Sequence, residues 1–303
     1  MPTESLIESQ GTTALPIGDI IKDYAKICQP SMAVALSATA VIGYMMAVEV
    51  SDPVQILILG VTALFAAAGA KALNQCSEVE LDKLMVRTQN RPLPTGRISL
   101  RNAKIMGWTF SIGSTATMAV AFHPMTAILS ALTVFSYIFI YTPLKQRSTF
   151  NTVIGAFPGA FPIWGGWFAG GGGFDDANAG IILFAIMFLW QFPHFLAIAW
   201  LCKDDYAAAG FKMLPIIDPE GRLTGRQIVV YSGTLVMVTL LPTILLGMTS
   251  TLYLAAVAIA GVNQMRLAAK FHASPGKPTA LSLLKFAYLH LLIIMTLMVI
   301  DKV

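Results

Sequence analysis

Charged residues and cysteines are scarce in this chain of 303 residues, and each shortage excludes a class of protein. Only 12% of the residues are charged, whereas 56% are hydrophobic and the mean hydropathy is +0.69. This composition excludes a soluble globular domain and predicts a protein that lies largely within a lipid bilayer. The three cysteines, Cys28, Cys76 and Cys202, form no Cys-x-x-Cys pair, so we expect neither a disulfide framework nor a zinc site.

The first 25 residues contain no arginine and no short apolar stretch behind a basic start, but they do contain four acidic residues. We therefore expect neither a cleaved secretory signal nor a mitochondrial transit peptide, and we predict a location in a bacterial inner membrane. The sequence pI is near 8.9, yet the basic residues are scattered over several loops and form no single stripe. Nucleic acid is therefore not an expected partner.

Nine apolar stretches are each long enough to cross roughly 30 Å of hydrocarbon. They cover residues 31–50, 54–74, 103–122, 125–142, 152–170, 179–201, 228–247, 252–265 and 281–300. We predict an all-α polytopic membrane protein with nine transmembrane helices, in which residues 1–30 are a cytoplasmic N-terminal segment and residues 31–303 are one transmembrane domain. The eighth stretch is short, which favours a tilted or partly re-entrant helix.

Lysines and arginines occur in alternate loops, as expected if those loops are cytoplasmic. The loops at 51–53, 123–124, 171–178 and 248–251 contain none. Of the 20 lysines and arginines, 17 lie before the first stretch or between the second and third, fourth and fifth, sixth and seventh, or eighth and ninth, with Lys104 just inside the third: Lys22, Lys26, Lys83, Arg87, Arg91, Arg97, Arg101, Lys104, Lys145, Arg147, Lys203, Lys212, Arg222, Arg226, Arg266, Lys270 and Lys277. This pattern predicts a cytoplasmic N-terminus and a C-terminus outside.

The densest polar stretch, residues 74–94, follows the second apolar stretch. Asn74, Glu78 and Asp82 are four residues apart, so on a helix each is rotated about 40° from the last and all three share a face. Their oxygens suit Mg²⁺, which binds through one or two carboxylates and completes its shell with phosphate oxygens and water. Arg87 and Arg91, also four apart, can form bidentate bonds to phosphate. The sequence therefore predicts a site for a metal-bridged diphosphate.

A second interpretation of this stretch is simpler. Charges just beyond a membrane helix usually form a solvated loop that sets orientation, and acid-to-base pairs four residues apart are common on helix surfaces. Composition and spacing leave both interpretations open.

The same stretch resembles the first acidic motif of the UbiA-type intramembrane prenyltransferases, in the form carried by the heme O synthase (protoheme IX farnesyltransferase) branch. That motif is Asn-x-x-x-Asp/Glu-x-x-x-Asp-x-x-Met-x-Arg-Thr-x-x-Arg-Pro-Leu. The residues that match it in register are Asn74, Glu78, Asp82, Met85, Arg87, Thr88, Arg91, Pro92 and Leu93. One departure is Glu78, where many members have aspartate, but a longer carboxylate can still reach a metal ion.

A second signature follows the sixth apolar stretch. Residues 190–195 read Trp-Gln-Phe-Pro-His-Phe, and residues 205–215 match Asp-Tyr-x-x-x-Gly-x-x-Met-Leu-Pro; both resemble the same branch. Relatives that prenylate quinone precursors are expected to carry spaced aspartates here, where this chain has Cys202 and Tyr206. His194 and Asp205 are eleven residues apart, so an unbroken helix would put them on one face. The alternative for His194 is a packing residue, although ionisable groups in membrane segments favour function.

Residues 141–147, Tyr-Thr-Pro-Leu-Lys-Gln-Arg, end the fourth stretch and resemble a Tyr-Thr-x-x-Leu-Lys-Arg segment of the family. The resemblance makes Lys145 a further candidate for diphosphate binding. The alternative is an interfacial tyrosine followed by orientation-setting charges.

The resemblance implies a helical prenyltransferase-type bundle around a central cavity, which transfers the farnesyl group of farnesyl diphosphate to a vinyl group of heme b, with water addition, to give heme O. It implies Mg²⁺ on Asn74, Glu78 and Asp82, diphosphate on Arg87, Arg91 and Lys145, and catalytic roles for Glu78, Asp82, His194 and Asp205. Implied partners are heme A synthase or a terminal oxidase assembly. The alternatives are a quinone- or chlorophyll-type prenyltransferase, and a transporter of an anionic lipid or metal.

Overall fold

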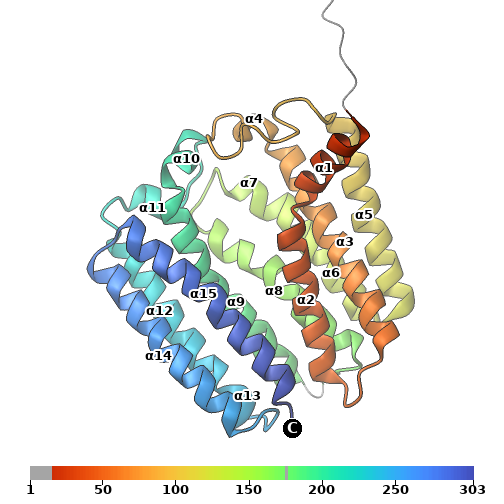
Figure 1. Cartoon of the computed structure of the whole chain (residues 1–303), viewed down its shortest axis with the longest axis vertical. Helices are drawn as coiled ribbons and strands as arrows, with labels where there is room; N and C mark the ends of the chain where they lie inside the picture. The colour runs from red at the N-terminus through yellow and green to blue at the C-terminus, as the bar shows by residue number, and fades with distance from the viewer. Residues whose placement is uncertain (1–15, 175–176) are drawn as a thin grey trace, which may run out of the picture.

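The computed structural model describes residues 16–174 and 177–303, which form a bundle of helices (Figure 1). Among these residues there is no strand, only an isolated bridge between Thr249 and Lys302. The all-α prediction is confirmed. The elements are α1 (Ile17–Cys28), α2 (Pro30–Ala47), α3 (Pro53–Ser77), α4 (Val79–Asp82), α5 (Leu100–Ala121), α6 (Pro124–Phe135), the π-helix η1 (Ser136–Tyr141), α7 (Thr142–Leu144), α8 (Asn151–Ala169), α9 (Ala177–Leu201), α10 (Lys203–Ala208), α11 (Leu214–Ile217), α12 (Arg222–Thr239), α13 (Leu241–Ile244), α14 (Thr251–Ala273) and α15 (Lys277–Ile300).

Seven helical segments in the described ranges are both long and apolar enough to cross a membrane. They are 30–47, 53–77, 124–144, 178–201, 222–244, 251–273 and 277–300. The other two predicted stretches correspond to α5 and α8, which have 22 and 19 residues and are not among these seven. The number of nine membrane spans therefore stays a prediction. The eighth stretch is not short: α14 continues to Ala273 and has 23 residues.

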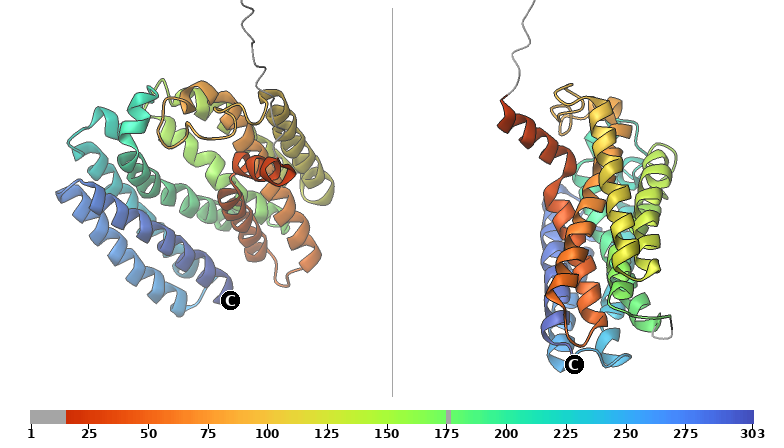
Figure 2. Two further views of the ribbon diagram at one scale, coloured as in Figure 1. Left: turned by 45° about the horizontal axis from the view of Figure 1, so that its top comes forward. Right: turned by 90° about the vertical axis from the view of Figure 1, so that its right-hand side faces the viewer.

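The helices pack as two groups that meet along α8 and α9. One group contains α2, α3, α5, α6 and α8, and the other contains α9, α12, α14 and α15 (Figures 1 and 2). Gly43 of α2 and Gly166 of α8 let these two helices approach closely, because a Cβ at either position would overlap the other helix's backbone. The second group is held to α8 and α2 by a large apolar cluster.

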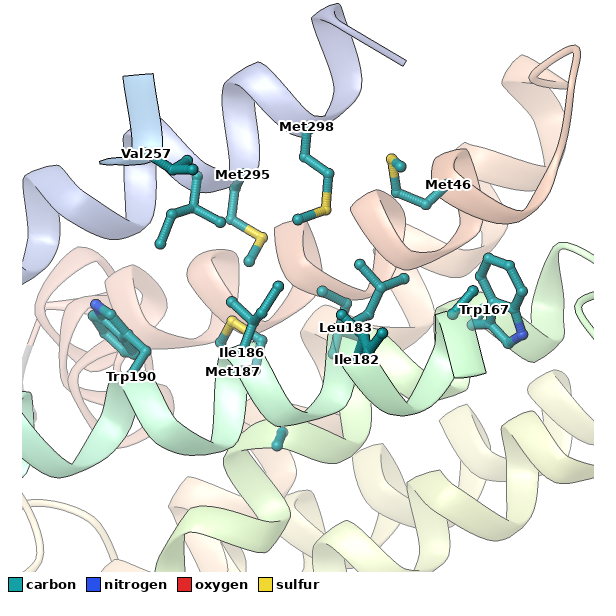
Figure 3. Packing of buried hydrophobic residues seen from close by; sticks show 14 of the residues in the cluster. Met46, Trp167, Ile182, Leu183, Ile186, Met187, Trp190, Val257, Met295 and Met298 are labelled. Atoms are coloured by element: carbon teal, nitrogen blue, oxygen red, sulfur yellow. The ribbon is translucent and has the colours of Figure 1, made fainter. Parts of the chain in front are cut away.

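That apolar cluster lies between α9 and the helices α12, α14 and α15. Ile186 and Met187 of α9 face Val257 and Met295 across it (Figure 3). Because the helices are apolar on several faces, this packing fills the interior while the remaining faces are left for lipid. No acidic, basic or histidine side chain belongs to the cluster, so we expect the charged chemistry elsewhere.

Helix α1 lies across the end of the bundle at which α4 and α10 are found, and the C-terminus lies at the opposite end (Figure 1). The Asp23 carboxylate holds α1 to the loop before α5, because its Oδ2 accepts a hydrogen bond of 2.7 Å from Arg97 Nε. The two ends of the described chain thus lie at opposite ends of the bundle. Which end faces the cytoplasm, and the division at residue 30, stay predictions.

Candidate active site at one end of the bundle

The segments that follow α3, α7 and α10 converge at one end of the bundle (Figures 1 and 2). Met85, in the first predicted motif, is only 2% exposed and packs in a cluster with Phe211 and Met213 of the second. Lys212 N donates to the carbonyl oxygen of Lys145 at 2.6 Å, which ties the second motif to the segment after α7. The structure therefore brings together three stretches that the sequence analysis treated separately.

We predicted that the first acidic motif lies on one continuous helix, but the structure divides it between two helices. Helix α3 ends at Ser77, and Glu78, with φ −108° and ψ 12°, separates it from α4. Glu78 N still donates to Asn74 O at 3.1 Å, and Asp82 N donates to Glu78 O at 2.8 Å. This four-residue spacing of hydrogen bonds carries the chain through the break and keeps the three residues on adjoining turns.

Both carboxylates of the motif are buried and paired with cations. Lys145 Nζ lies 2.7 Å from Glu78 Oε1, and Arg91 Nη1 lies 2.9 Å from Asp82 Oδ2. Glu78 is 6% exposed and Asp82 only 1%. Burial raises the pKa of Asp82 above its ordinary value, although the Arg91 guanidinium opposes this effect. Two of the three predicted diphosphate-binding cations thus lie directly at the predicted metal ligands.

One segment, residues 137–145, runs beside the end of α3 and contacts it at successive helical turns. Asn74 Nδ2 donates to Thr142 Oγ1 at 2.9 Å, one level below the Lys145–Glu78 pair. Thr142 donates in turn to the carbonyl oxygen of Tyr137 at 2.7 Å. This is where the chain forms η1, because Pro143 has no N–H to donate to the carbonyl four residues earlier and the helix widens there. Such π-turns are frequent at functional sites.

The other predicted site residues lie near this site but differ in their contacts. Arg87 is exposed and forms no ion pair with a carboxylate in the described ranges. Asp205 Oδ1 accepts a hydrogen bond of 2.9 Å from the backbone N–H of Val86. Asp205 therefore holds the backbone between Asp82 and Arg87, a contact that sequence spacing could not show.

His194 lies on α9, which continues through Pro193 to Leu201. Its ring stacks on Trp190, with centroids 4.6 Å apart, and meets the edge of Tyr288 at 4.7 Å. The residue is 6% exposed, and its Nδ1 atom has no hydrogen-bond partner among the residues described. His194 and Asp205 do not share an unbroken helix, because α9 ends before Cys202 and α10 begins after it. That expectation was wrong.

The donor set of the first motif fits Mg²⁺. In residues 16–174 and 177–303 there is no group of three or more histidine, cysteine, aspartate or glutamate side chains that could hold a metal ion. The candidate ligands here are instead two carboxylates and one amide. The hydrogen bonds use one oxygen of each carboxylate and the nitrogen of Asn74, so Asn74 Oδ1, Glu78 Oε2 and Asp82 Oδ1 are the atoms available to a hard cation.

An open groove of about 540 Å³ lies between α3 and α5 and is lined by residues such as Val61, Phe65, Phe110 and Thr117. None of its lining residues belongs to the acidic motif, so volume alone is a poor guide to the chemistry here. The predicted central cavity stays a prediction.

Residues 36–292 match the UbiA prenyltransferase family. The chain belongs to this family. It is 36% identical over 281 residues to a protein of Opitutus terrae named protoheme IX farnesyltransferase, an alignment that covers 92% of this chain and 94% of that protein. The resemblance to the UbiA-type enzymes that the two motifs indicated is thereby confirmed.

Two solved structures share the fold at low identity. A digeranylgeranylglyceryl phosphate synthase has a TM-score of 0.77 at 20% identity, with 93% of this chain and 98% of that chain covered. A UbiA homolog from Archaeoglobus fulgidus bound to DMAPP and Mg²⁺ has a TM-score of 0.68 at 15% identity, with 91% and 99% covered. The UbiA bundle predicted from the motifs is therefore confirmed as the fold.

The sequence analysis did not single out two residues that the structure places next to the acidic motif: Lys71 and Tyr137. Tyr137 carries no signal of its own in an apolar stretch, because tyrosine is ordinary there. Lys71 did carry a signal, since it is the one charged residue of α3.

Proposed function

We propose that this UbiA-family protein is a Mg²⁺-dependent protoheme IX farnesyltransferase. It joins the farnesyl group of farnesyl diphosphate to a vinyl group of heme b, with addition of water, and releases heme O and diphosphate. The observation that carries the proposal is the similarity, along almost the whole chain, to the Opitutus terrae protein of that name. Further relatives with the same name support it.

Asn74, Glu78 and Asp82 would hold Mg²⁺, which when bound neutralises the charge of the diphosphate and makes it a better leaving group. Arg91 and Lys145 supply N–H donors to phosphate oxygens beside these ligands, with Arg87 assisting from the exposed loop. Asp205 keeps that loop in place through its bond to Val86. In this view the ion pairs hold the two cations at the positions where the phosphates bind.

The acceptor side is assigned to the second motif. The C1–O bond of the farnesyl group breaks and its electron pair leaves with the diphosphate, while C1 bonds to the terminal vinyl carbon. Water then adds to the carbocation that remains next to the porphyrin and loses a proton. The buried His194, with an unpartnered Nδ1 atom between Trp190 and Tyr288, orients the porphyrin or takes that proton. Apolar walls keep other water from the allylic cation.

The proposal includes a bacterial inner membrane, a cytoplasmic active site and delivery of heme O to heme A synthase or a terminal oxidase assembly. The orientation is testable with single cysteines at Asn90 and Phe174, both exposed, in a background without Cys28, Cys76 and Cys202. An impermeant thiol reagent applied from outside should label the cysteine at 174 and not the one at 90. The reverse labelling would place the acidic motif outside and overturn the orientation.

The activity itself is tested with purified protein in detergent, supplied with heme b, farnesyl diphosphate and Mg²⁺. The expected product has the mass of heme b plus one farnesyl group and one hydroxyl group. A product formed from a quinone precursor, and none from heme b, would favour the quinone-type alternative. No product from either, together with flux of an anion or metal into proteoliposomes, would favour a transporter.

A further inference from the structure

Lys71 is a lysine inside a membrane-spanning helix. It is the one charged residue of α3, the segment that spans Pro53–Ser77, and its side chain is half-buried. A charge placed there is costly, so a lysine in such a position is retained for a function or faces a polar partner. Its contacts decide between these alternatives.

The contacts of Lys71 are with one tyrosine. Its Nζ atom lies 2.7 Å from the hydroxyl oxygen of Tyr137 and 5.3 Å from the centroid of that ring. Lys145 and Arg91 are each paired with a carboxylate, but no carboxylate in the described part of the chain lies within ion-pair distance of Lys71. A hydroxyl group and a ring face compensate an ammonium charge only partly. Lys71 therefore has a donor group that no carboxylate of the described residues accepts from.

Lys71 also lies on the face that carries the diphosphate site. It precedes Asn74 by three residues and Glu78 by seven, so it is one turn deeper in the bundle, about 4.5 Å along the α3 axis from Asn74. The three residues contact Tyr137, Thr142 and Lys145 in the same order. A prenyl diphosphate held with its distal phosphate at the aqueous end directs its chain inward. The phosphate attached to the prenyl carbon is then on the Lys71 side.

The balance of charge at the site is consistent with an anion in this place. Two buried carboxylates, Glu78 and Asp82, face three cations, Lys71, Lys145 and Arg91. Among these buried and half-buried groups there is therefore one more basic side chain than there are carboxylates, at the place where a multiply charged anion and its metal ion are proposed to bind.

We propose that Lys71 binds the phosphate next to the prenyl carbon and stabilises the leaving group. As the C1–O bond breaks, the electron pair stays on the bridging oxygen, and the Lys71 ammonium donates a hydrogen bond to that oxygen as its negative charge develops. C1 forms its new bond to the vinyl carbon. Tyr137 holds the ammonium group in position before substrate binds. This inference rests on the proposed function for its acceptor, but the phosphate contact is independent of which acceptor is used.

The test compares Lys71→Met with Lys285→Met, because Lys285 is also within a membrane-spanning helix but is exposed. Affinity for 2-fluorofarnesyl diphosphate, a poorly reactive analogue that keeps the oxygen on C1, is measured by calorimetry with Mg²⁺ present. Lys71→Met should weaken it about 10- to 100-fold, the worth of one charge-assisted hydrogen bond. Lys285→Met should not change it, and Lys71→Arg should recover part of the loss. If Lys71→Met does not insert, Lys71→Gln replaces it.

A second measurement locates the contact. Farnesyl monophosphate has only the phosphate next to the prenyl carbon, so Lys71→Met should weaken its binding by the same factor as that of the diphosphate analogue. Monophosphate binding that is unchanged would place Lys71 at the distal phosphate and overturn the proposal. An increase in the KM for heme b alone would assign Lys71 to the porphyrin carboxylates and would also overturn it. Wild-type protein that binds the analogue through Lys71 but forms no heme O would refute the proposed function and leave this inference standing.

Discussion

The two motif-bearing regions of the molecule differ in how they use polar side chains. At α3 and α4, buried carboxylates are paired with Arg91 and Lys145, so charge is concentrated and compensated. At α9 and α10, His194 lies among aromatic rings without a partner for Nδ1, and Asp205 bonds to a backbone N–H of the other region. The comparison teaches that charge is concentrated in one region and aromatic surface in the other. This is the division that the proposed function requires of a diphosphate side and a porphyrin side.

The largest effect is expected at Asp82. Asp82→Asn removes a carboxylate charge from the proposed Mg²⁺ site and leaves Arg91 without its ion-pair partner. We therefore expect prenylation to fall by about 1000-fold, with the protein still inserted in the membrane. The matched control is Glu80→Gln, because Glu80 is exposed and pairs only with Lys83 at the surface. Product mass and size-exclusion chromatography check both. Activity close to wild type in Asp82→Asn would remove this residue from the metal role.

His194→Ala should impair the porphyrin side of the reaction, which is assigned to the second region, and should leave diphosphate binding in the first region unchanged. We expect prenylation to fall about 100-fold and the Soret spectrum of bound heme b to change, because a positioned proton acceptor contributes on that scale. Binding of a farnesyl diphosphate analogue should be unchanged. His272→Ala, at an exposed histidine of α14, serves as the control. If the spectrum is unchanged and analogue binding is lost, His194 belongs to the diphosphate region.

Arg91→Lys tests whether the guanidinium group of the charged region binds the diphosphate. A compact ammonium cannot reproduce a planar guanidinium fork. The binding free energy of farnesyl diphosphate should therefore weaken by about 1 to 3 kcal/mol, measured as a higher KM, and the KM for heme b should not change. Arg266→Lys is the control, since Arg266 is exposed and contacts only Asn263. Equal changes in both KM values would show that Arg91 supports the whole fold of the site.

The smallest effect concerns pH. Burial raises the pKa of Asp82, so the folded protein binds this proton more tightly than the unfolded chain does. As the pH falls through that raised pKa, the contribution of Asp82 to the free energy of unfolding therefore increases. Affinity for Mg²⁺ should decrease over the same interval, by about tenfold per pH unit below the pKa, since the metal needs the ionised carboxylate.

Calorimetric titration of Mg²⁺ at several pH values measures this dependence. Glu80→Gln should follow the wild-type curve, and Asp82→Asn should have a weak affinity that lacks the decrease attributed to Asp82. A wild-type affinity that is constant down to the ordinary range of an aspartate would contradict the predicted origin of the shift.

Much of the fold and of the site was predictable because it depends on local sequence. Hydropathy along the chain is enough to predict membrane helices, since each span is selected by the apolar character of its own residues. The motif around Asn74, Glu78 and Asp82 was readable because its ligands are a few residues apart. The break at Glu78 was not, because the i→i+4 hydrogen bonds continue through it and no proline or glycine marks it.

Only the tertiary structure decided which charges meet. Lys145 reaches Glu78 across 67 residues, Asp205 reaches Val86 across 119, and Lys71 reaches Tyr137 across 66. Such partners are chosen by which helices pack side by side and at what depth, and a single sequence holds no spacing rule for them. The sequence by itself therefore determined the helical membrane class, the family and the position of the acidic motif. The packing of α3 against the segment from Tyr137 to Lys145, and of one motif loop on the other, determined how these residues form a site.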